Sequence, residues 1–174
     1  MRTIKITVKC AGFTFIEFLM ALGVLGILLT ITVVAMRDLM LKNQITAEVN
    51  QIIAAVNFAR SEAIKRGIPV TYCASDNGKA CHGDWSDGQI ILAASQVLRI
   101  YPALFDGSRL NWSGNFGKDH LLQLLPTGFT NGQSGSFYYC PAIDSMGKRI
   151  IVNQAGRTRV AAENIACPLQ DRSK

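Results

Sequence analysis

Histidine is scarce in this sequence: only His82 and His120 occur among its 174 residues, and neither lies in a recognisable catalytic motif. The chain also lacks the Gly-x-Ser-x-Gly pattern of serine hydrolases and the glycine-rich phosphate loop that ends in Lys-Ser or Lys-Thr. It has no Cys-x-x-Cys pair, which disfavours a zinc site made from Cys73, Cys81 and His82. These absences argue against an enzyme and against a bound cofactor or metal.

Acidic residues are also few, and they are unevenly placed. The chain has 18 Lys and Arg against 12 Asp and Glu, which gives a formal net charge of +6. Residues 1–12 contain basic side chains and no acid, and residues 145–174 contain six basic and two acidic residues. The positive excess therefore lies at the two ends of the chain, although a surplus of this size does not by itself identify a nucleic-acid partner.

The segment 13–36 is strongly apolar and contains one charge, Glu17. Its last 19 residues, Phe18–Met36, are uncharged, which is about the length needed to cross the core of a bilayer. A secretory signal would end in a cleavage site after its apolar region, whereas the natural break here, Gly12-Phe13, precedes it. Cleavage at this break would give Phe13 a new α-amino group. Because a carboxylate at the edge of an apolar span is costly unless paired, we expect Glu17 to pair with this amino group of a neighbouring subunit. The alternative is an ordinary signal anchor in which Glu17 has no specific role.

The stretch Gly12-Phe13-Thr14-Phe15-Ile16-Glu17-Phe18-Leu19 resembles the leader and N-methylation motif of type IV pilins and type II secretion pseudopilins. The resemblance implies that a prepilin peptidase removes residues 1–12 and methylates Phe13. It implies that Glu17 acts in assembly with other pilin subunits. It also implies a single-pass anchor in the bacterial inner membrane, a periplasmic C-terminal domain, and a place in the pilus after assembly.

Removal of the leader would also remove Cys10 and leave four cysteines. An even number in an exported domain favours two disulfides. We favour Cys73–Cys81, because the loop between them is short and rich in Gly and Asn, together with Cys140–Cys167. Four cysteines allow three pairings, and free buried thiols are the alternative.

An apolar stripe follows the apolar segment at spacings of 4, 3, 4, 3 and 4 residues: Ile45, Val49, Ile52, Val56, Ala59 and Ala63. This spacing predicts a helix that packs against a globular domain. Gly67 and Pro69 are typical of a helix end, so we expect one long helix within residues 13–66.

After Pro69, short apolar or alternating runs are separated by turn-forming clusters, which predicts a β-rich domain of about seven strands over residues 67–174. The expected strands lie within residues 69–75, 88–95, 96–102, 120–126, 135–141, 148–154 and 157–162. The expected fold class is α+β and type IV pilin-like, with a long N-terminal helix packed on a C-terminal antiparallel β-rich domain. The segment from Trp85 to Gly88 is similar to the strand entry of the GspH/FimT group of minor pilins.

The stretch Gln154-Ala155-Gly156-Arg157-Thr158-Arg159-Val160 places two arginines on a predicted returning strand. Side chains at i and i+2 of a strand point to one face, so Arg157 and Arg159 should project side by side and Thr158 should point away. Guanidinium groups match phosphate oxygens, and an exposed Gly156 would let a ligand approach closely. Lys148 and Arg149 should widen this basic patch, and Arg172 and Lys174 could join it.

Gly156-Arg157-Thr158-Arg159 matches the Gly-Arg-x-Arg motif of FimT-type minor pilins, which bind DNA during natural transformation. The resemblance implies that Arg157 and Arg159 contact DNA and that Gly156 shapes the loop. Five aromatic residues could stack on single-stranded bases, although core packing is the favoured interpretation: Trp112, Phe116, Phe129, Tyr138 and Tyr139. The alternative function is a structural minor pseudopilin of a type II secretion system without DNA binding.

Overall fold

The computed structural model describes residues 12, 14–105, 107–115, 121–142 and 146–167, and it describes only the backbone of residues 29–35, 37 and 38. The chain divides into two compact units, Met1–Asn43 and Gln44–Lys174. This boundary lies inside the helix α1, Phe15–Arg66, because the second half of α1 packs within the larger unit.

Helix α1 begins with a capping box. The Oγ1 atom of Thr14 accepts the N–H of Glu17 at 3.4 Å, and a carboxylate oxygen of Glu17 lies 3.5 Å from the backbone N of Thr14. At the other end, Gly67 adopts a φ of 66°, and its N–H donates to the carbonyl of Ala63 at 3.0 Å. Both ends lie within a residue or two of those expected from the sequence.

None of the helical stretches in the described part of the chain meets the length and hydropathy needed to cross a membrane.

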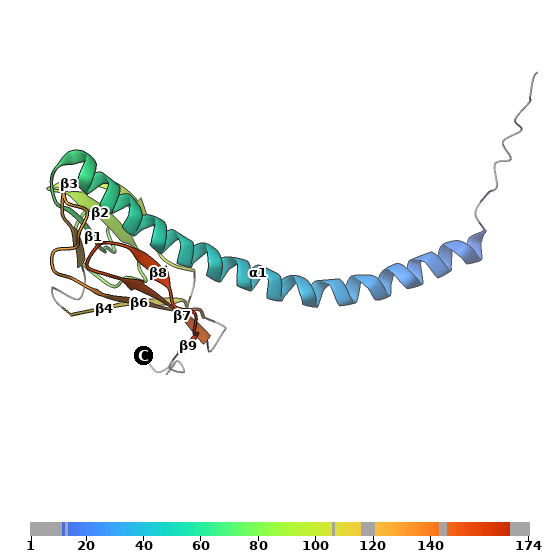
Figure 1. The fold of residues 1–174 in the computed structure, drawn as a ribbon. Coiled ribbons are helices and arrows are strands. Elements are labelled where there is room, and N and C mark those ends of the chain that lie inside the picture. Colours follow the sequence, from blue (N-terminus) through green and yellow to red (C-terminus); the bar gives the residue numbers. More distant parts are fainter. Residues whose placement is uncertain (1–11, 13, 106, 116–120, 143–145, 168–174) are drawn as a thin grey trace, which may run out of the picture. The chain divides into compact units, whose positions relative to one another are not determined.

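The predicted apolar stripe forms the helical side of the core. Val49, Ile52, Val56, Ala59 and Ala63 are buried, and Ile45 is partly buried against them. The same core cluster includes side chains from the inner faces of two sheets, so the second half of α1 and both sheets share one apolar interior (Figure 1). The prediction of a helix packed on a β-rich domain is confirmed.

Two antiparallel sheets make up the rest of the described fold. The first has the order β3-β2-β1-β5, and its strands are β1 Val70–Ala74, β2 Gln89–Ala93, β3 Gln96–Tyr101 and β5 Leu121–Leu124. The second has the order β4-β6-β7-β8, with β9 also paired to β7, and its strands are β4 Arg109–Gly114, β6 Gly135–Cys140, β7 Met146–Val152, β8 Thr158–Val160 and β9 Ile165–Ala166.

Each of the expected strands has a counterpart in the structure, and two further strands were not expected. β4 has the sequence RLNWSG, whose Asn, Ser and Gly are typical of a turn. Its Leu110 and Trp112 nevertheless alternate with exposed residues, which is the period of a half-buried strand. β9 spans only two residues, next to the disulfide of Cys167, so its own sequence carries little signal.

Aromatic rings join the two sheets. The centroid of the Trp85 ring lies 5.0 Å from that of Tyr72 on β1 and 5.0 Å from that of Phe137 on β6. Trp112 on β4 lies 4.5 Å from Phe137. Because a ring buried between two sheets removes a large apolar area from water, this cluster contributes strongly to the stability of the fold.

Both disulfides are formed, in the pairing that the sequence favours. Cys73–Cys81 closes a loop with a sequence separation of 8, and Cys140–Cys167 closes one with a separation of 27. The second bridge holds the described C-terminal segment against β6 and β7, since a Cβ placed on Gly147 of β7 would lie 2.7 Å from the Sγ atom of Cys167.

Candidate nucleic-acid interface

The chain reverses between β7 and β8 in a tight turn of residues 154–156, which Asn153 and Arg157 close. The N–H of Gly156 donates to the carbonyl of Asn153 at 2.9 Å, and the N–H of Asn153 donates to the carbonyl of Arg157 at 3.1 Å. Gly156 has a φ of 68°, which is the conformation that such a loop requires at its last position. The Oδ1 atom of Asn153 also accepts the N–H of Arg157 at 2.9 Å, so the backbone that carries this arginine is fixed.

The tip of the hairpin packs against a neighbouring loop. The carbonyl of Gln154 accepts the N–H of Thr130 at 2.9 Å, and a Cβ placed on Gly156 would lie 2.5 Å from the carbonyl oxygen of Gly128. Gly156 is therefore buried, and its N–H is already used within the turn. The expectation of an exposed Gly156 open to a ligand is wrong. The loop of Gly128 occupies the space beside Gly156 that a ligand was expected to use.

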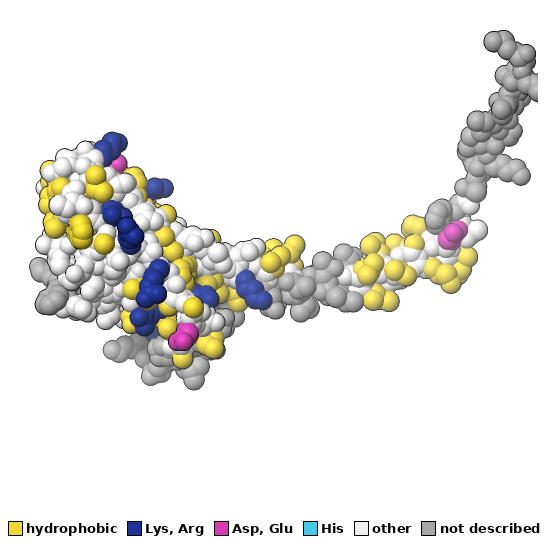
Figure 2. All heavy atoms as spheres, in the orientation of Figure 1, with side chains coloured by type: hydrophobic (Ala, Val, Ile, Leu, Met, Phe, Trp, Pro, Cys, Tyr) yellow, Lys and Arg dark blue, Asp and Glu magenta, His cyan; other side chains and the backbone are white. Residues whose placement is uncertain are grey.

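Arg157 and Arg159 are both exposed and line one hollow together with Ile151, Asn153 and Thr158. The hollow has a volume of about 240 Å³, and its lining contains no carboxylate. Neither arginine forms an ion pair with any described residue, and Figure 2 shows basic side chains over the β7–β8 hairpin. Thr158 pairs with the buried Val152, so its side chain faces the core side of the strand. Two unpaired guanidinium groups beside one hollow favour an anionic ligand.

Lys148 and Arg149 lie on opposite faces of β7. Arg149 pairs with Tyr138, whereas Lys148 pairs with the buried Tyr139 and donates from Nζ to Oδ1 of Asn164 at 2.5 Å. The expectation that both residues widen the patch is wrong for Lys148, because successive side chains of a strand alternate between faces. Arg149 shares its face with Arg159, and its Nε atom is buried without a hydrogen-bond partner in the described structure.

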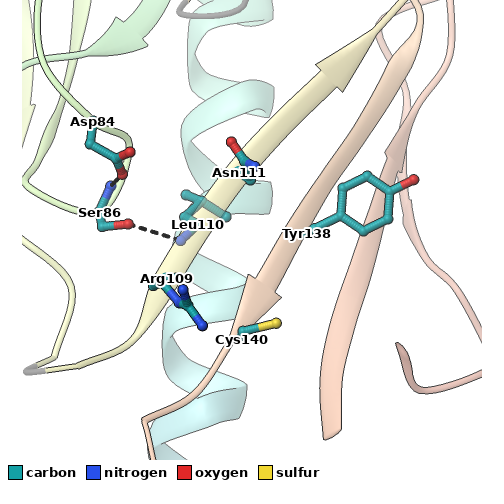
Figure 3. Close-up of a pocket in the computed structure, with 7 residues that line it drawn as sticks. All are labelled: Asp84, Ser86, Arg109, Leu110, Asn111, Tyr138 and Cys140. Atoms are coloured by element: carbon teal, nitrogen blue, oxygen red, sulfur yellow. Dashed lines mark hydrogen bonds between the residues drawn. The ribbon is translucent and has the colours of Figure 1, made fainter. Parts of the chain in front are cut away.

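The outer face of the second sheet carries another arginine, Arg109 on β4. It lines a larger hollow of about 340 Å³ with Asp84, Ser86, Leu110, Asn111, Tyr138 and Cys140 (Figure 3). The N–H of Ser86 donates to Asp84 at 2.8 Å, and the N–H of Leu110 donates to Oγ of Ser86 at 3.0 Å. Because the Asp84 carboxylate lines this hollow, it suits an anionic polymer less well than the hairpin hollow does.

Except for His82, the other residues considered from the sequence belong to the N-terminal part or lie outside the described residues. Gly12 is described and exposed, whereas Phe13, Arg172, Lys174 and His120 lie outside the described residues. Glu17 is exposed in the first turn of α1, where its described contacts are those of the capping box. The Nδ1 atom of His82 lies 3.2 Å from a carboxylate oxygen of Asp76, and both side chains are exposed, so the pair is a surface contact.

Arg60 is not among the site residues expected from the sequence, and Phe129 is named there only as one of five aromatic residues for which core packing is favoured. Arg60 on α1 donates from Nε to the carbonyl of Gly128 at 2.9 Å, and Phe129 is exposed beside it. Their sequence positions are far from residue 156, so only the contact between the loop and the hairpin tip brings them to this surface.

The sequence model of the family described as "Type II transport protein GspH" matches residues 48–156, which is more than half of the chain. The structure of the type IV minor pilin FimU of Pseudomonas aeruginosa PAO1 is similar, with a TM-score of 0.58 and 19% identity, over 73% of this chain and 97% of that one. A second crystal form of FimU gives a TM-score of 0.53 and 20% identity, over 71% and 99%. The minor pseudopilin EpsH of Vibrio cholerae gives a TM-score of 0.48 and 13% identity, over 68% and 97%. No curated protein sequence matches the chain.

Proposed function

This chain belongs to the family described as type II transport protein GspH, and from that premise we propose that it is a minor pilin that binds DNA through its β7–β8 hairpin. The observation that carries the proposal is the hollow lined by Arg157 and Arg159, with no carboxylate in its lining. Guanidinium groups at such a site contact phosphates without reading bases. Two to four such contacts give weak binding that does not depend on sequence, with a dissociation constant of about 10⁻⁴–10⁻⁶ M.

The process that this binding serves is DNA uptake for natural transformation. Weak binding by each subunit suffices when several subunits contact one DNA molecule, because linked contacts raise the effective affinity without any new interaction. Retraction of the pilus would then pull the bound DNA inward. No covalent chemistry is required of the protein.

The N-terminal part supplies export and assembly in this proposal. A prepilin peptidase removes residues 1–12 after Gly12 and methylates Phe13, and the apolar segment 13–36 anchors the mature chain in the bacterial inner membrane. The domain of residues 67–174 lies in the periplasm until the subunit is extracted into the pilus. Glu17 then pairs with the N-terminus of a neighbouring subunit, which offsets the cost of a carboxylate beside apolar surface.

A structural pseudopilin of a type II secretion system is the second candidate, and the family description, which names type II transport, favours it. Such a subunit would use the same helix and the same fold, and it would have no need for Arg157 or Arg159. The two candidates therefore differ in one testable property of the hairpin.

The test is a titration of the full chain, in a non-ionic detergent, with a fluorescently labelled DNA duplex. The Arg157→Ala/Arg159→Ala variant is compared with Lys65→Ala/Lys79→Ala, which removes the same net charge from exposed positions outside the hairpin. We expect the arginine variant to bind at least about tenfold more weakly, and the control to stay within about twofold of the wild type. If the wild type does not bind at low salt, or if both variants lose binding equally, the structural pseudopilin is the better account.

A further inference from the structure

Phe129, like Phe105, is an exposed phenylalanine of the larger unit. Its exposed fraction is 52%, whereas Phe137, Trp112 and Tyr139 are buried in the core. An exposed phenylalanine contributes little to the stability of the fold, so packing does not account for this side chain.

The position of Phe129 is set by contacts on both sides of it in the chain. Gly128, which precedes it, packs its carbonyl against Gly156, and Thr130, which follows it, donates to the carbonyl of Gln154 from its N–H at 2.9 Å and from its hydroxyl at 3.2 Å. The carbonyl of Gln133 is a second acceptor within reach of the Thr130 hydroxyl, which has one hydrogen for both carbonyls, and Thr130 and Gln133 are buried. Phe129 is thus held beside the tip of the arginine hairpin on a well-bonded loop.

Arg60 brings a further positive charge to the same place from α1. Its Nε atom donates to the carbonyl of Gly128 at 2.9 Å, and its Cδ atom lies 3.3 Å from the position of a Cβ on Gly156. Arg60 forms no ion pair with a described residue. Gly128 therefore links the parts of this surface. Its carbonyl accepts the hydrogen bond of Arg60 and packs against the turn that leads into Arg157, and Phe129 is the next residue in the chain.

We propose that Arg60, Phe129, Arg157 and Arg159 form a binding surface for single-stranded nucleic acid, in which Phe129 stacks on a base and the arginines contact the flanking phosphates. Sites of this kind combine basic groups that follow the backbone with aromatic rings on which bases stack. A duplex hides the faces of its bases, so Phe129 adds affinity only for an unpaired strand. The proposal rests on the hairpin being a DNA site, and it names the form of DNA that this site prefers.

The test compares a labelled oligothymidine with a duplex of the same length, again with the full chain in a non-ionic detergent. We expect Phe129→Ala to weaken oligothymidine binding by about tenfold and to leave duplex binding within about twofold, because stacking is lost and charge is not. Phe129→Trp should retain oligothymidine binding. Phe105→Ala is the matched control, since Phe105 is 57% exposed in another loop of the same unit.

Arg60 is tested by its effect on the salt dependence. Arg60→Gln keeps a donor for the carbonyl of Gly128 and removes the charge, so the slope of log affinity for oligothymidine against log salt should decrease in magnitude by about 0.7. Phe129→Ala should leave this slope unchanged.

Three results would overturn the inference while leaving DNA binding by the hairpin intact. The first is unchanged oligothymidine binding by Phe129→Ala. The second is an equal loss of affinity for oligothymidine and for the duplex. The third is a Phe129→Ala variant that loses only incorporation into filaments, which would assign the ring to a contact between subunits. If the wild type binds neither ligand, the proposed function itself fails, so the two failures are distinguishable.

Discussion

At the scale of single residues, the glycine at the hairpin tip has a different role from a glycine in an open turn. Gly156 has a φ of 68° and lies against the carbonyl of Gly128, whereas Gly132 has a φ of 72° and a Cβ there would meet no described atom within 4 Å. The two positions therefore separate the cost of the backbone conformation from the cost of a close contact.

We predict that Gly132→Ala lowers the free energy of unfolding by about 1 kcal/mol, because alanine adopts a positive φ unfavourably. Gly156→Ala should cost distinctly more, because its Cβ would lie 2.5 Å from a backbone oxygen and displace the tip. Urea denaturation followed by tryptophan fluorescence measures both values. Equal losses would mean that the packing of the tip against Gly128 contributes little.

Lys148 and Arg149 provide a second test, since they are adjacent in the chain and each carries one positive charge. Arg149→Ala should lower the magnitude of the salt slope for duplex binding by about 0.9, because in the proposed complex Arg149 contacts a phosphate on the face of Arg159. Lys148→Ala should leave the slope nearly unchanged, because Lys148 lies on the other face and bonds Asn164. Equal effects of the two substitutions would show that net charge, and not the face of the sheet, determines binding.

At the scale of secondary-structure elements, the start of α1 gives Glu17 two separable roles. Its carboxylate takes part in the capping box with Thr14, and in the proposed filament it pairs with the N-terminus of a neighbouring subunit. A glutamine can replace a glutamate in a capping box, but it has no charge.

Glu17→Gln should therefore keep the helix content of the subunit and lose incorporation into filaments, whereas Glu17→Ala should lose both the cap and incorporation. Circular dichroism measures the helix content, and immunoblotting of sheared filaments measures incorporation. DNA binding should be unchanged in both variants, because the hairpin belongs to the other compact unit. Normal incorporation of Glu17→Gln would restrict the carboxylate to its capping role.

The two disulfides should differ in their contribution to stability according to the length of chain that each one closes. Their sequence separations of 27 and 8 correspond to about 3.5 and about 2.5 kcal/mol in the chain-entropy description. Cys140→Ser/Cys167→Ser should therefore lower the midpoint of urea denaturation more than Cys73→Ser/Cys81→Ser does. A larger loss for the shorter loop would show that native contacts, and not loop entropy, determine the effect.

The elements that the sequence predicted were those whose signal is local. The helix stripe and the strands with alternating apolar residues repeat within a few residues, so their periods can be read without tertiary information. β4 was missed because Asn111, Ser113 and Gly114 resemble a turn, although Asn111 and Ser113 are simply the exposed residues of an alternating strand. Gly156 was misread for a different reason: its sequence shows that a turn needs glycine, but not that the loop of Gly128 fills the space beside it.

At the scale of the whole molecule, the site residues follow the same division. The sequence predicted Arg157 and Arg159 because they stand two residues apart on one strand. It could not place Arg60 or Phe129 beside them, because Arg60, Gly156 and Gly128, the neighbour of Phe129, meet only when α1, the loop after β5 and the β7–β8 hairpin are brought together. Lys148 was placed with the patch by its sequence position and is separated from it by the alternation of side chains along β7.

The central claim is that the chain binds DNA phosphates weakly and electrostatically at the β7–β8 hairpin. Binding is not a general effect of the net charge of the chain, which is +6. The most direct measurement is the slope of log affinity for a DNA duplex against log salt, for the full chain and for the Arg157→Ala/Arg159→Ala variant. The account predicts a slope of about −2 to −4 for the wild type and a decrease in magnitude of about 1.8 in the variant. A wild type that does not bind at low salt, or a slope that the two substitutions leave unchanged, would contradict it.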